Sequence, residues 1–536
     1  MLLSLQVSSP LAVVDDSIRV EQDIIDYAVT VIIPDRGESI RAAAQVRYVV
    51  RGGIGPLILD FDAALEVDSV LLNDGRVGSR DADWNWELVK GAAPDFLVVR
   101  QWSQPGDTLS VTVHYHGEPE DGLVIGTNVH GRRTAFADNW PNRARHWFPG
   151  EDHPSDKAIV SFTVEVPDGW RAVSNGRLLG VDSLENGRTV WRWRESHPIP
   201  VHTMVIGAGE LTVTYLGEVG GVPQEAWTFA QDSAFAVEQP FRRAIEIVAV
   251  LESLIGPFPY DKLAHVQSST RYGGMENSSA IFYAEAAYSS RRMSEGLVAH
   301  ETVHQWFGDA VSQYDWHHLW LSEGFATYFA PLFFESVGET EVFEDAMSSS
   351  KRRYMGSDVV DRPVIDTTVQ DPFDLLNANN YQKGSWVLHM LRSELGDSSF
   401  FAGIREYYRV YRDSTALTSD LSETVSRHAG RSMDWFFEQW LLQPGYPQLE
   451  VNWSYVESTG SLDVVITQVQ QQEWGEYTLR LPLELEFDDG EMKQAVIRVA
   501  GRESAHSIDV DRKPVAVITD PDETLLMSVV GVRSGN

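Results

Sequence analysis

Residues 300–304, His-Glu-Thr-Val-His, place two histidines four positions apart with a glutamate beside the first. Residues four apart on an α-helix lie one turn from each other on the same face, so the imidazoles of His300 and His304 could share one metal ion. Glu301 would lie on the adjoining strip, beside the ion. The pattern also arises by chance on amphipathic helices, so these five residues do not by themselves predict a metal site.

Glu323 offers a third metal ligand, with eighteen residues between it and His304. It lies at the head of an apolar helical run, where a carboxylate has no evident structural reason to be buried. A catalytic zinc takes three protein ligands and keeps one position for water, and His300, His304 and Glu323 make such a set. The ion would lower the pKa of water and polarise a carbonyl, while Glu301 would accept the proton and later deliver it to a leaving amine.

Two other pairs of histidines suit a metal less well. His317 and His318 lie between tryptophans, and we expect them to pack in the core or to support the ligands from behind. His114 and His116 alternate with apolar residues on a predicted strand, and we expect them at the surface.

The residue pattern predicts strands in the first part of the chain. Apolar and polar side chains alternate along 109–116 and again along 160–166, where the run ends at Pro167-Asp168-Gly169. Residues 1–210 are therefore predicted to form a large β domain.

The pattern changes to helical spacing from about 235, and 295–311 is predicted to be one helix whose apolar face buries the two histidines. Two prolines and a glycine in 443–447 end the helical part, and alternation returns beyond it. We predict an α+β multidomain protein with a mainly α catalytic domain at 211–445 and a small β-sandwich at 446–536.

Composition excludes several classes of partner. The chain has 43 Lys plus Arg against 78 Asp plus Glu, a formal charge of -35, which disfavours nucleic acid and anionic membrane surfaces. It has no cysteine, so a metal must bind His, Asp or Glu. No signal-like segment or long apolar run occurs, so we expect a soluble monomer, cytoplasmic rather than a secreted mature form.

Several motifs, in order and spacing, resemble the aminopeptidase N family of gluzincin zinc peptidases. The resemblance covers about 140 to 445 and rests on PNRARHWFPGEDHPSDKA, GPFPYDKLAHVQ, GGMEN at 273–277, HETVH at 300–304, the glutamate at 323 and YQKG at 381–384. It implies a saddle-shaped N-terminal β domain, a thermolysin-like catalytic domain and one Zn²⁺ per chain.

The resemblance also implies roles for individual residues. Zinc would bind His300, His304 and Glu323, with Glu301 as the general base. Glu276 would hold the free α-amine of a peptide substrate, because a carboxylate both attracts the amine and fixes its distance from the scissile carbonyl. Tyr381 would donate to the developing oxyanion.

The same segment contributes the remaining substrate-binding residues. Gly273 and Gly274 would let the backbone approach an extended peptide closely, and Met275 and Asn277 flank Glu276. The expected function is removal of N-terminal residues from peptides with a free N-terminus.

Two departures from the family pattern bear on specificity. Trp140 stands where a Gln or Glu usually helps to bind the amine, so recognition would rest on Glu276 alone or with a neighbour such as Asp138. Many relatives carry a helical domain after the sandwich that closes the active site, whereas this sequence stops at Asn536. We expect a more open site that admits longer peptides.

Three alternatives follow from these features. The first is a zinc peptidase with a relaxed amine requirement. The second is an epoxide hydrolase of the leukotriene hydrolase type, which shares the double glycine. The third is a non-catalytic binding scaffold, which is the weakest because such relatives lose ligands and this chain keeps all of them.

Overall fold

The computed structural model of the chain describes residues 19, 21–52, 56–72, 75–76, 86–91, 95–100 and 103–535. Its contacts form two compact units. The N-terminal unit consists of Val14–Ser322 and Tyr407–Leu417, and the C-terminal unit contains Glu323–Glu406 and Thr418–Asn536. In the described part of the chain, the crossings between the two units lie inside helices α5 (Trp320–Ser336) and α8 (Asp397–Tyr411) and between Leu417 and Thr418.

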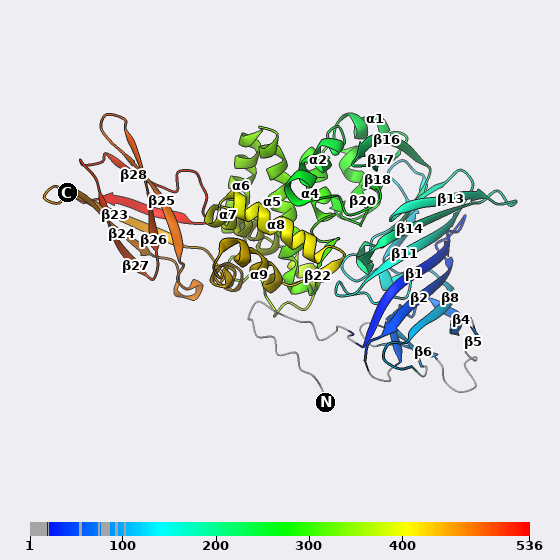
Figure 1. Cartoon of the computed structure of the whole chain (residues 1–536). Coiled ribbons are helices and arrows are strands. Elements are labelled where there is room, and N and C mark those ends of the chain that lie inside the picture. Colours follow the sequence, from blue (N-terminus) through cyan, green and yellow to red (C-terminus); the bar gives the residue numbers. More distant parts are fainter. Residues whose placement is uncertain are drawn as a thin grey trace. The chain divides into compact units, whose positions relative to one another are not determined.

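An eight-stranded sheet forms the base of the N-terminal unit (Figure 1). Its strands, in spatial order, are β13 (Arg177–Ser183), β14 (Thr189–Pro200), β11 (Lys157–Val166), β1 (Gln22–Ile32), β2 (Ile40–Val50), β8 (Thr108–Gly117), β4 (Glu66–Leu72) and β5 (Gly75–Arg76). Only β1 and β11 pair in parallel. In β8 the side chains of Val111, Val113 and Tyr115 are buried while those between them are partly exposed, which confirms the predicted alternation.

Two smaller sheets lie in the same unit. One has the order β12 (Arg171–Ser174), β15 (Ile206–Gly209), β10 (Arg133–Ala137) and β9 (Leu123–Thr127), and the other β3 (Leu57–Asp60), β7 (Phe96–Val99) and β6 (Trp86–Val89). The predicted turn after β11 is present, because Trp170 N–H donates to the carbonyl of Pro167 over 3.2 Å and Gly169 takes a φ of 79°. Glycine adopts this positive φ without strain.

A mixed five-stranded sheet carries the residues around the GGMEN segment. Its order is β16 (Leu211–Val219), β17 (Val222–Phe229), β18 (Leu263–Ser268), β20 (Ala280–Ala284) and β19 (Gly274–Met275), with β19 at the edge. Helices α1 (Ser233–Glu238), α2 (Ala244–Ile255), α3 (Glu285–Ser289) and α4 (Glu295–His304) accompany it. The predicted helical character of this region omitted β18 and β20, which are almost wholly buried and therefore show no alternation.

The prediction of one helix over 295–311 is wrong, because α4 ends at His304. Beyond it the N–H of Asp309 donates to the carbonyl of His304 over 3.1 Å, and Gly308 has a φ of 122°. A helix cannot continue through that conformation. The chain instead enters the short strand β21 (Val311–Gln313), which pairs in parallel with β22 (Ser414–Ala416).

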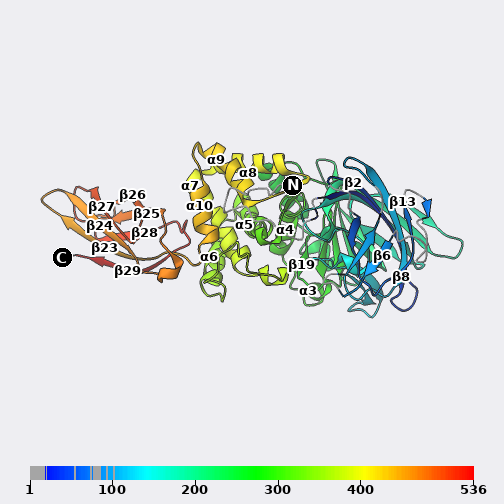
Figure 2. The ribbon, with the colours of Figure 1, turned by 90° about the horizontal axis from the view of Figure 1, so that it is seen from below.

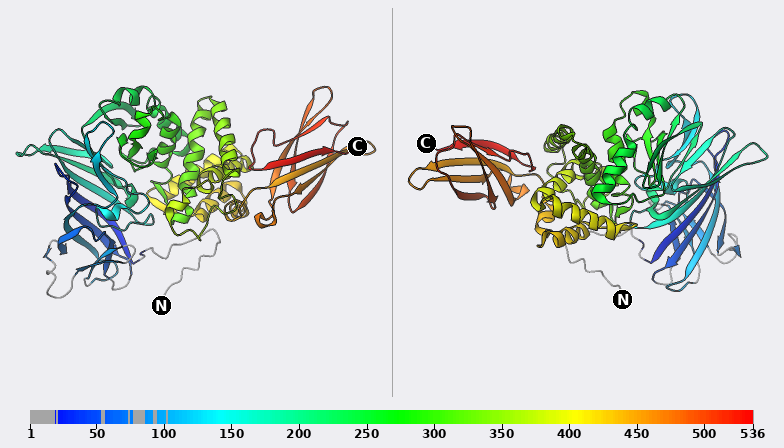
Figure 3. Two further views of the ribbon diagram at one scale, coloured as in Figure 1. Left: turned by 180° about the vertical axis from the view of Figure 1, so that it is seen from behind. Right: turned by 45° about the horizontal axis from the view of Figure 1, so that its top comes forward.

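The C-terminal unit combines helices with two sheets (Figure 3). Its helices are α6 (Thr340–Met355), α7 (Gly384–Leu395), α9 (Thr418–Ala429) and α10 (Asp434–Phe437), with π-helical turns η5 (Asn379–Lys383) and η6 (Glu438–Leu442). The sheets are β27 (Glu503–Asp509), β24 (Ser461–Gln468), β23 (Gln448–Val456) and β29 (Ser528–Ser534), and β26 (Met492–Val499), β25 (Leu479–Glu486) and β28 (Ala516–Thr519).

The predicted alternation in the last part of the chain is confirmed. Leu481, Leu483 and Leu485 of β25 are fully buried, as are Leu462, Val464 and Ile466 of β24. The whole chain is thus a mixed α+β protein, β-rich first and helical in its middle, with sheets again at its end (Figure 2). No helix in the described part of the chain has the length and apolar character that crossing a bilayer requires.

Candidate metal and peptide-binding site

Residues at the start of helix α4 and along it stabilise the helix. Ser294 caps its start, since the Oγ of Ser294 accepts from the N–H of Leu297 over 3.2 Å, and Glu295 in the first turn suits the positive end of the helix dipole. Val298 and Val303 are fully buried and anchor the helix in the core. His300 and Glu301 lie between these two valines, and His304 directly follows Val303.

The two histidines of α4 direct their ring nitrogens to one place. The Nε2 atoms of His300 and His304 lie 3.2 Å apart, with the rings at 84° to each other. The Nδ1 of His304 lies 3.2 Å from the carbonyl oxygen of Phe307. A carbonyl only accepts, so Nδ1 carries the proton and the Nε2 lone pair is left to bind a metal. The donor set therefore fits an ion that prefers imidazole, such as zinc.

Ser322 supports the same histidine from the first turn of α5. Its Oγ lies 2.9 Å from the Nδ1 of His304. Gly308 makes this contact possible, because a Cβ at that position would lie 2.4 Å from the Oγ of Ser322 and 3.1 Å from the Nδ1 of His304. Glu323, the third predicted ligand, directly follows Ser322 in α5.

Glu301 is buried against the edge strand β19. Only 5% of its surface is exposed. A Cβ at Gly274 would lie 2.2 Å from the Oε1 of Glu301, so glycine is required for the carboxylate to lie against this backbone. Gly273 has no such neighbour, since a Cβ there would meet nothing within 4 Å. The double glycine therefore permits a close approach at Gly274, where the carboxylate of Glu301, the predicted base, lies against the backbone.

A second carboxylate joins Glu301 in the same unit. One ligand atom each from Glu276, Glu301 and His304 lies within 4.8 Å of the others, and all three residues are buried. Two buried carboxylates so close repel each other unless a cation or proton lies between them. The pair is therefore suited to a positive group such as an ammonium.

Gln305, the residue after the second histidine, fixes Glu276 in place. Its Nε2 donates to the carbonyl of Glu276 over 2.7 Å and to the Oδ2 of Asp309 over 2.9 Å. Its Oε1 accepts from the N–H of Ser279 over 2.6 Å. One side chain thereby ties the end of α4 to the segment that carries Glu276. Within that segment the side chains of Met275 and Asn277 are both buried, at 3% and 0% exposure.

Tyr381 and Glu323 are paired within the C-terminal unit. The hydroxyl of Tyr381 donates to the Oε1 of Glu323 over 2.7 Å. Tyr381 lies in the π-helical turn η5, and such turns recur at functional sites. Close packing supports the pair, because a Cβ at Gly324 would lie 3.0 Å from the backbone of Gly384.

The position of Trp140 is apolar and enclosed. Trp140 is 3% exposed, and its ring contacts those of Tyr272 and Trp316 edge-on, with centroids 6.1 and 5.4 Å away. Asp138, the neighbour that could have bound the amine, is 2% exposed and forms ion pairs with Arg143 at 3.0 Å and Arg271 at 3.2 Å. Its charge is therefore balanced by two guanidinium groups.

The two histidine pairs set aside from the metal, 317–318 and 114–116, differ in burial. His318 is fully buried, and burial lowers its pKa to about 4. His317 pairs through Nδ1 with the Oδ1 of Asp315 over 2.7 Å. His116 is partly exposed and lies 3.0 Å from Asp68.

Residues that hold the site in place were missed from sequence. Ser322, Gln305 and Gly308 all touch or support predicted site residues. Two converging imidazoles with two buried carboxylates beside them are groups that a metal-dependent hydrolase could use.

Comparison with known proteins agrees with this class. The family model of the Peptidase M1 N-terminal domain matches residues 26–202, and that of the Peptidase family M1 domain matches 241–440. Together they cover most of the chain, and the second contains all the predicted site residues. The chain therefore belongs to peptidase family M1, the aminopeptidase N family of metallopeptidases, which confirms the resemblance.

Several members of this family are similar along much of the chain. Aminopeptidase M1-A of Oryza sativa is 30% identical over 61% of this chain and 39% of its own length. Leucyl aminopeptidase of Saccharolobus solfataricus is 27% identical over 63% and 43%, and aminopeptidase B of Mus musculus is 25% identical over 77% and 67%. The chain spans about half the length of the curated relatives it matches.

Proposed function

We propose that the chain is a zinc-dependent aminopeptidase that removes N-terminal residues from peptides. The observation that carries this proposal is the buried group of Glu276, Glu301 and His304 beside the converging Nε2 atoms of His300 and His304. Three of the relatives are named aminopeptidases, which supports cleavage at the N-terminal end of the substrate. The catalytic part would be 211–445, between a β domain at 1–210 and a sandwich at 446–536.

His300, His304 and Glu323 would hold one zinc ion per chain. The tautomer fixed at His304 supports this, and so does the position of Glu323 directly after a residue that contacts His304. Bound there, zinc supplies positive charge that polarises a carbonyl and makes water more acidic.

Glu301 would act as the base. Its side chain is buried against β19, which shields it from bulk water on that side. It would take a proton from the attacking water and return it to the departing amine. Glu276 would receive the substrate ammonium, which relieves the repulsion between the two carboxylates and sets the distance to the scissile carbonyl.

Tyr381 would donate its hydroxyl proton to the oxygen that gains charge, exchanging its present partner, the Oε1 of Glu323, for the substrate. Among the described strands, β19 has a neighbour on one side only, so an extended peptide could add to the other side by main-chain hydrogen bonds. Gly273, where a side chain would meet open space, would keep this edge accessible.

The test compares one aminoacyl anilide in its free-amine and N-acetylated forms. Wild-type enzyme should cleave the free amine and not the acetylated form. Glu276→Gln should lose most of this discrimination, because the amide no longer attracts the ammonium. Equal rates on both forms with wild-type enzyme would refute the aminopeptidase assignment and favour a peptidase with a relaxed amine requirement.

A further inference from the structure

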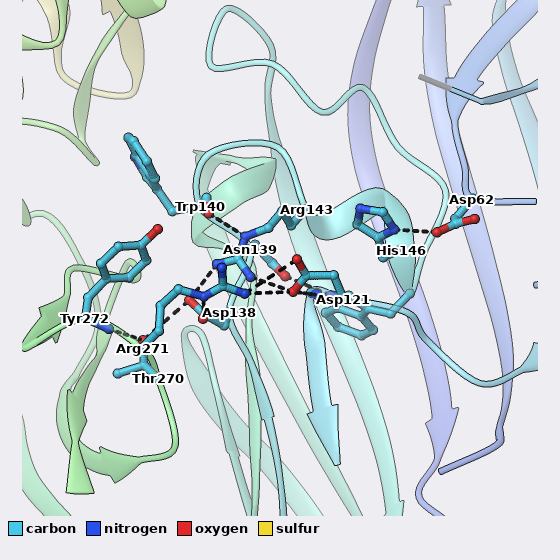
Figure 4. A network of polar contacts seen from close by, with 12 residues as sticks. Asp62, Asp121, Asp138, Asn139, Trp140, Arg143, His146, Thr270, Arg271 and Tyr272 are labelled. Atoms are coloured by element: carbon cyan, nitrogen blue, oxygen red, sulfur yellow. Dashed lines mark hydrogen bonds and ion pairs between the residues drawn. The ribbon is translucent and has the colours of Figure 1, made fainter. Parts of the chain in front are cut away.

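Four charged side chains of the N-terminal unit form a closed ring of alternating sign (Figure 4). Arg143 donates from Nη1 to the Oδ1 of Asp121 over 2.7 Å and lies with Nη2 3.0 Å from the Oδ1 of Asp138. Arg271 donates from Nε to the Oδ2 of Asp138 over 3.2 Å and from Nη2 to the Oδ1 of Asp121 over 3.1 Å. Each carboxylate thus meets both guanidinium groups. This set of four residues is called the ion ring below.

The ion ring joins segments that are far apart in sequence. Asp121 lies between β8 and β9, Asp138 and Arg143 follow β10, and Arg271 lies between β18 and β19. Arg271 is two residues before Gly273 and five before Glu276. The ring therefore connects the N-terminal β region to the loop that presents Glu276.

The buried side of the ring is well fixed and the loop side is less so. The side chains of Asp138 and Arg143 are 2% and 5% exposed, whereas that of Arg271 is 49% exposed. Arg143 also donates from Nε to the carbonyl of Trp140 over 2.8 Å. The ring thus has a rigid base at 138–143, to which the loop is attached through Arg271.

The surroundings of Asp121 favour its charged form. Burial works against the charge of Asp121, but the hydrogen bond from the N–H of Gly122 and the charge of Arg143 keep the pKa of Asp121 below its ordinary value. Two positive and two negative charges cancel, so the ring adds little net field at Glu276. The charge of Asp138 in particular is balanced by Arg143 and Arg271, so this carboxylate does not attract the substrate ammonium.

The loop 269–273 has further contacts besides the ion pairs, among them the N–H of Ala284, which donates to the carbonyl of Gly273 over 3.1 Å. Thr270 donates from Oγ1 to the Oδ1 of Asp138 over 3.4 Å, and Tyr272 touches Trp140 edge-on. The N–H of Tyr272 reaches only the Oγ1 of Thr270, over 3.5 Å. Among the described contacts, the two carboxylates of the ion ring are thus the strongest long-range partners of this loop.

We propose that Arg271 is a positioning residue for amine recognition, which acts by locking the loop 269–277 to the ion ring so that Glu276 alone reads the substrate ammonium. This rests on the proposed aminopeptidase function. A single carboxylate can set the register of a substrate only if its own loop is fixed, because a shift of about 1 Å at a reacting centre costs up to about a hundredfold in rate. The ion ring fixes the loop, and this takes the place of a second amine-binding side chain at position 140.

The test uses Arg271→Ala, Asp121→Asn and their double variant, with Arg192→Ala as the matched control. Arg192 is also half-exposed and pairs with one aspartate, Asp182, but on the eight-stranded sheet. Two measurements are made: KM and kcat for a free-amine aminoacyl anilide, and deuterium uptake by the amides of 269–277.

Arg271→Ala should raise KM about tenfold with kcat within about threefold of wild type, and it should speed exchange in 269–277 without lowering the melting temperature. Asp121→Asn should act in the same direction, and the double variant should be no worse than Arg271→Ala. Arg192→Ala should match wild type. Unchanged KM and exchange, additive effects, or an equal fall of kcat and stability would overturn the proposal. Failure of wild-type enzyme to cleave the anilide would instead refute the proposed function, and the exchange measurement would still test the ring.

Discussion

Helix α4 and the loop 269–277 present the two buried carboxylates of one site, yet they are held in different ways. In α4, Glu301 and its two histidines are placed by helical spacing, a serine cap and a buried apolar side. The loop has no regular structure before β19, and Glu276 is positioned by the pairing of β19 with β20, by Gln305 and, in our proposal, by the ion ring. The position of Glu301, the proposed base, is thus determined by residues near it in sequence. The position of Glu276, the proposed amine-binding residue, depends on residues as distant as Asp121.

This difference predicts different consequences of mutation. Local spacing is robust, so changes in α4 should act through the chemistry of the altered group. The loop depends on several distant contacts, so changes there should act through position and appear in KM.

Glu301→Gln should lower kcat by about 10²–10⁴-fold while zinc content stays at the wild-type level, because the amide fills the same space but cannot take up a proton. Rates are measured at saturating substrate and zinc by atomic emission. Glu295→Gln, in the first turn of the same helix, serves as the control and should keep full activity. Retained turnover in Glu301→Gln would mean that the base lies elsewhere.

Gly274→Ala should lower kcat by about tenfold to a hundredfold, since the new Cβ would lie 2.2 Å from the Oε1 of Glu301 and must displace it. Gly273→Ala is the matched comparison and should keep kcat within about twofold of wild type, because its Cβ would meet no protein atom within 4 Å, so any effect at the peptide-binding edge would appear in KM. Steady-state kinetics on both variants gives the comparison. Equal losses would show that the double glycine serves the peptide rather than the base.

Lys157→Met should alter the pH dependence of stability, because the Nζ of Lys157 donates to the carbonyls of Asp309 and Ala310, over 2.7 and 2.8 Å, in the turn after α4. Burial lowers the pKa of Lys157 to about 7. Between pH 7 and about 10 the unfolded chain then holds a proton that the folded chain has lost, so the contribution of Lys157 to the free energy of unfolding rises with pH there.

The wild-type rise, at most about 1.4 kcal/mol per pH unit, should be missing in the variant. Urea midpoints of both proteins at pH 6.5, 8 and 9.5 measure the effect. Parallel curves for wild type and Lys157→Met would show that the amine does not titrate in this range. The result also tells whether α4, whose residues are positioned locally, needs a long-range tether of its own.

The sequence was most informative where the structure is local. The histidine pair could be predicted because 3.6-residue periodicity alone brings His300 and His304 together. The alternation of β8, β11 and β25 was visible because each has one buried and one more exposed face.

Long-range features could not be predicted in this way. The end of α4 at His304 depends on a glycine whose φ no spacing rule gives, and β18 and β20 lack alternation because both faces are buried. Ser322 and Gln305 are ordinary polar residues in sequence, and only the fold brings them to His304 and Glu276. The ion ring joins three segments whose pairing depends on sheet topology.

Metal content tests the central claim most directly. Wild-type protein is stripped with a chelator, dialysed, and titrated with zinc while bound metal and hydrolysis of a free-amine anilide are followed together. We expect one zinc per chain and activity that returns in proportion to it, whereas His304→Ala should take up no zinc at the same concentrations. No zinc uptake by the wild-type protein, or full activity in its metal-free form, would contradict the account.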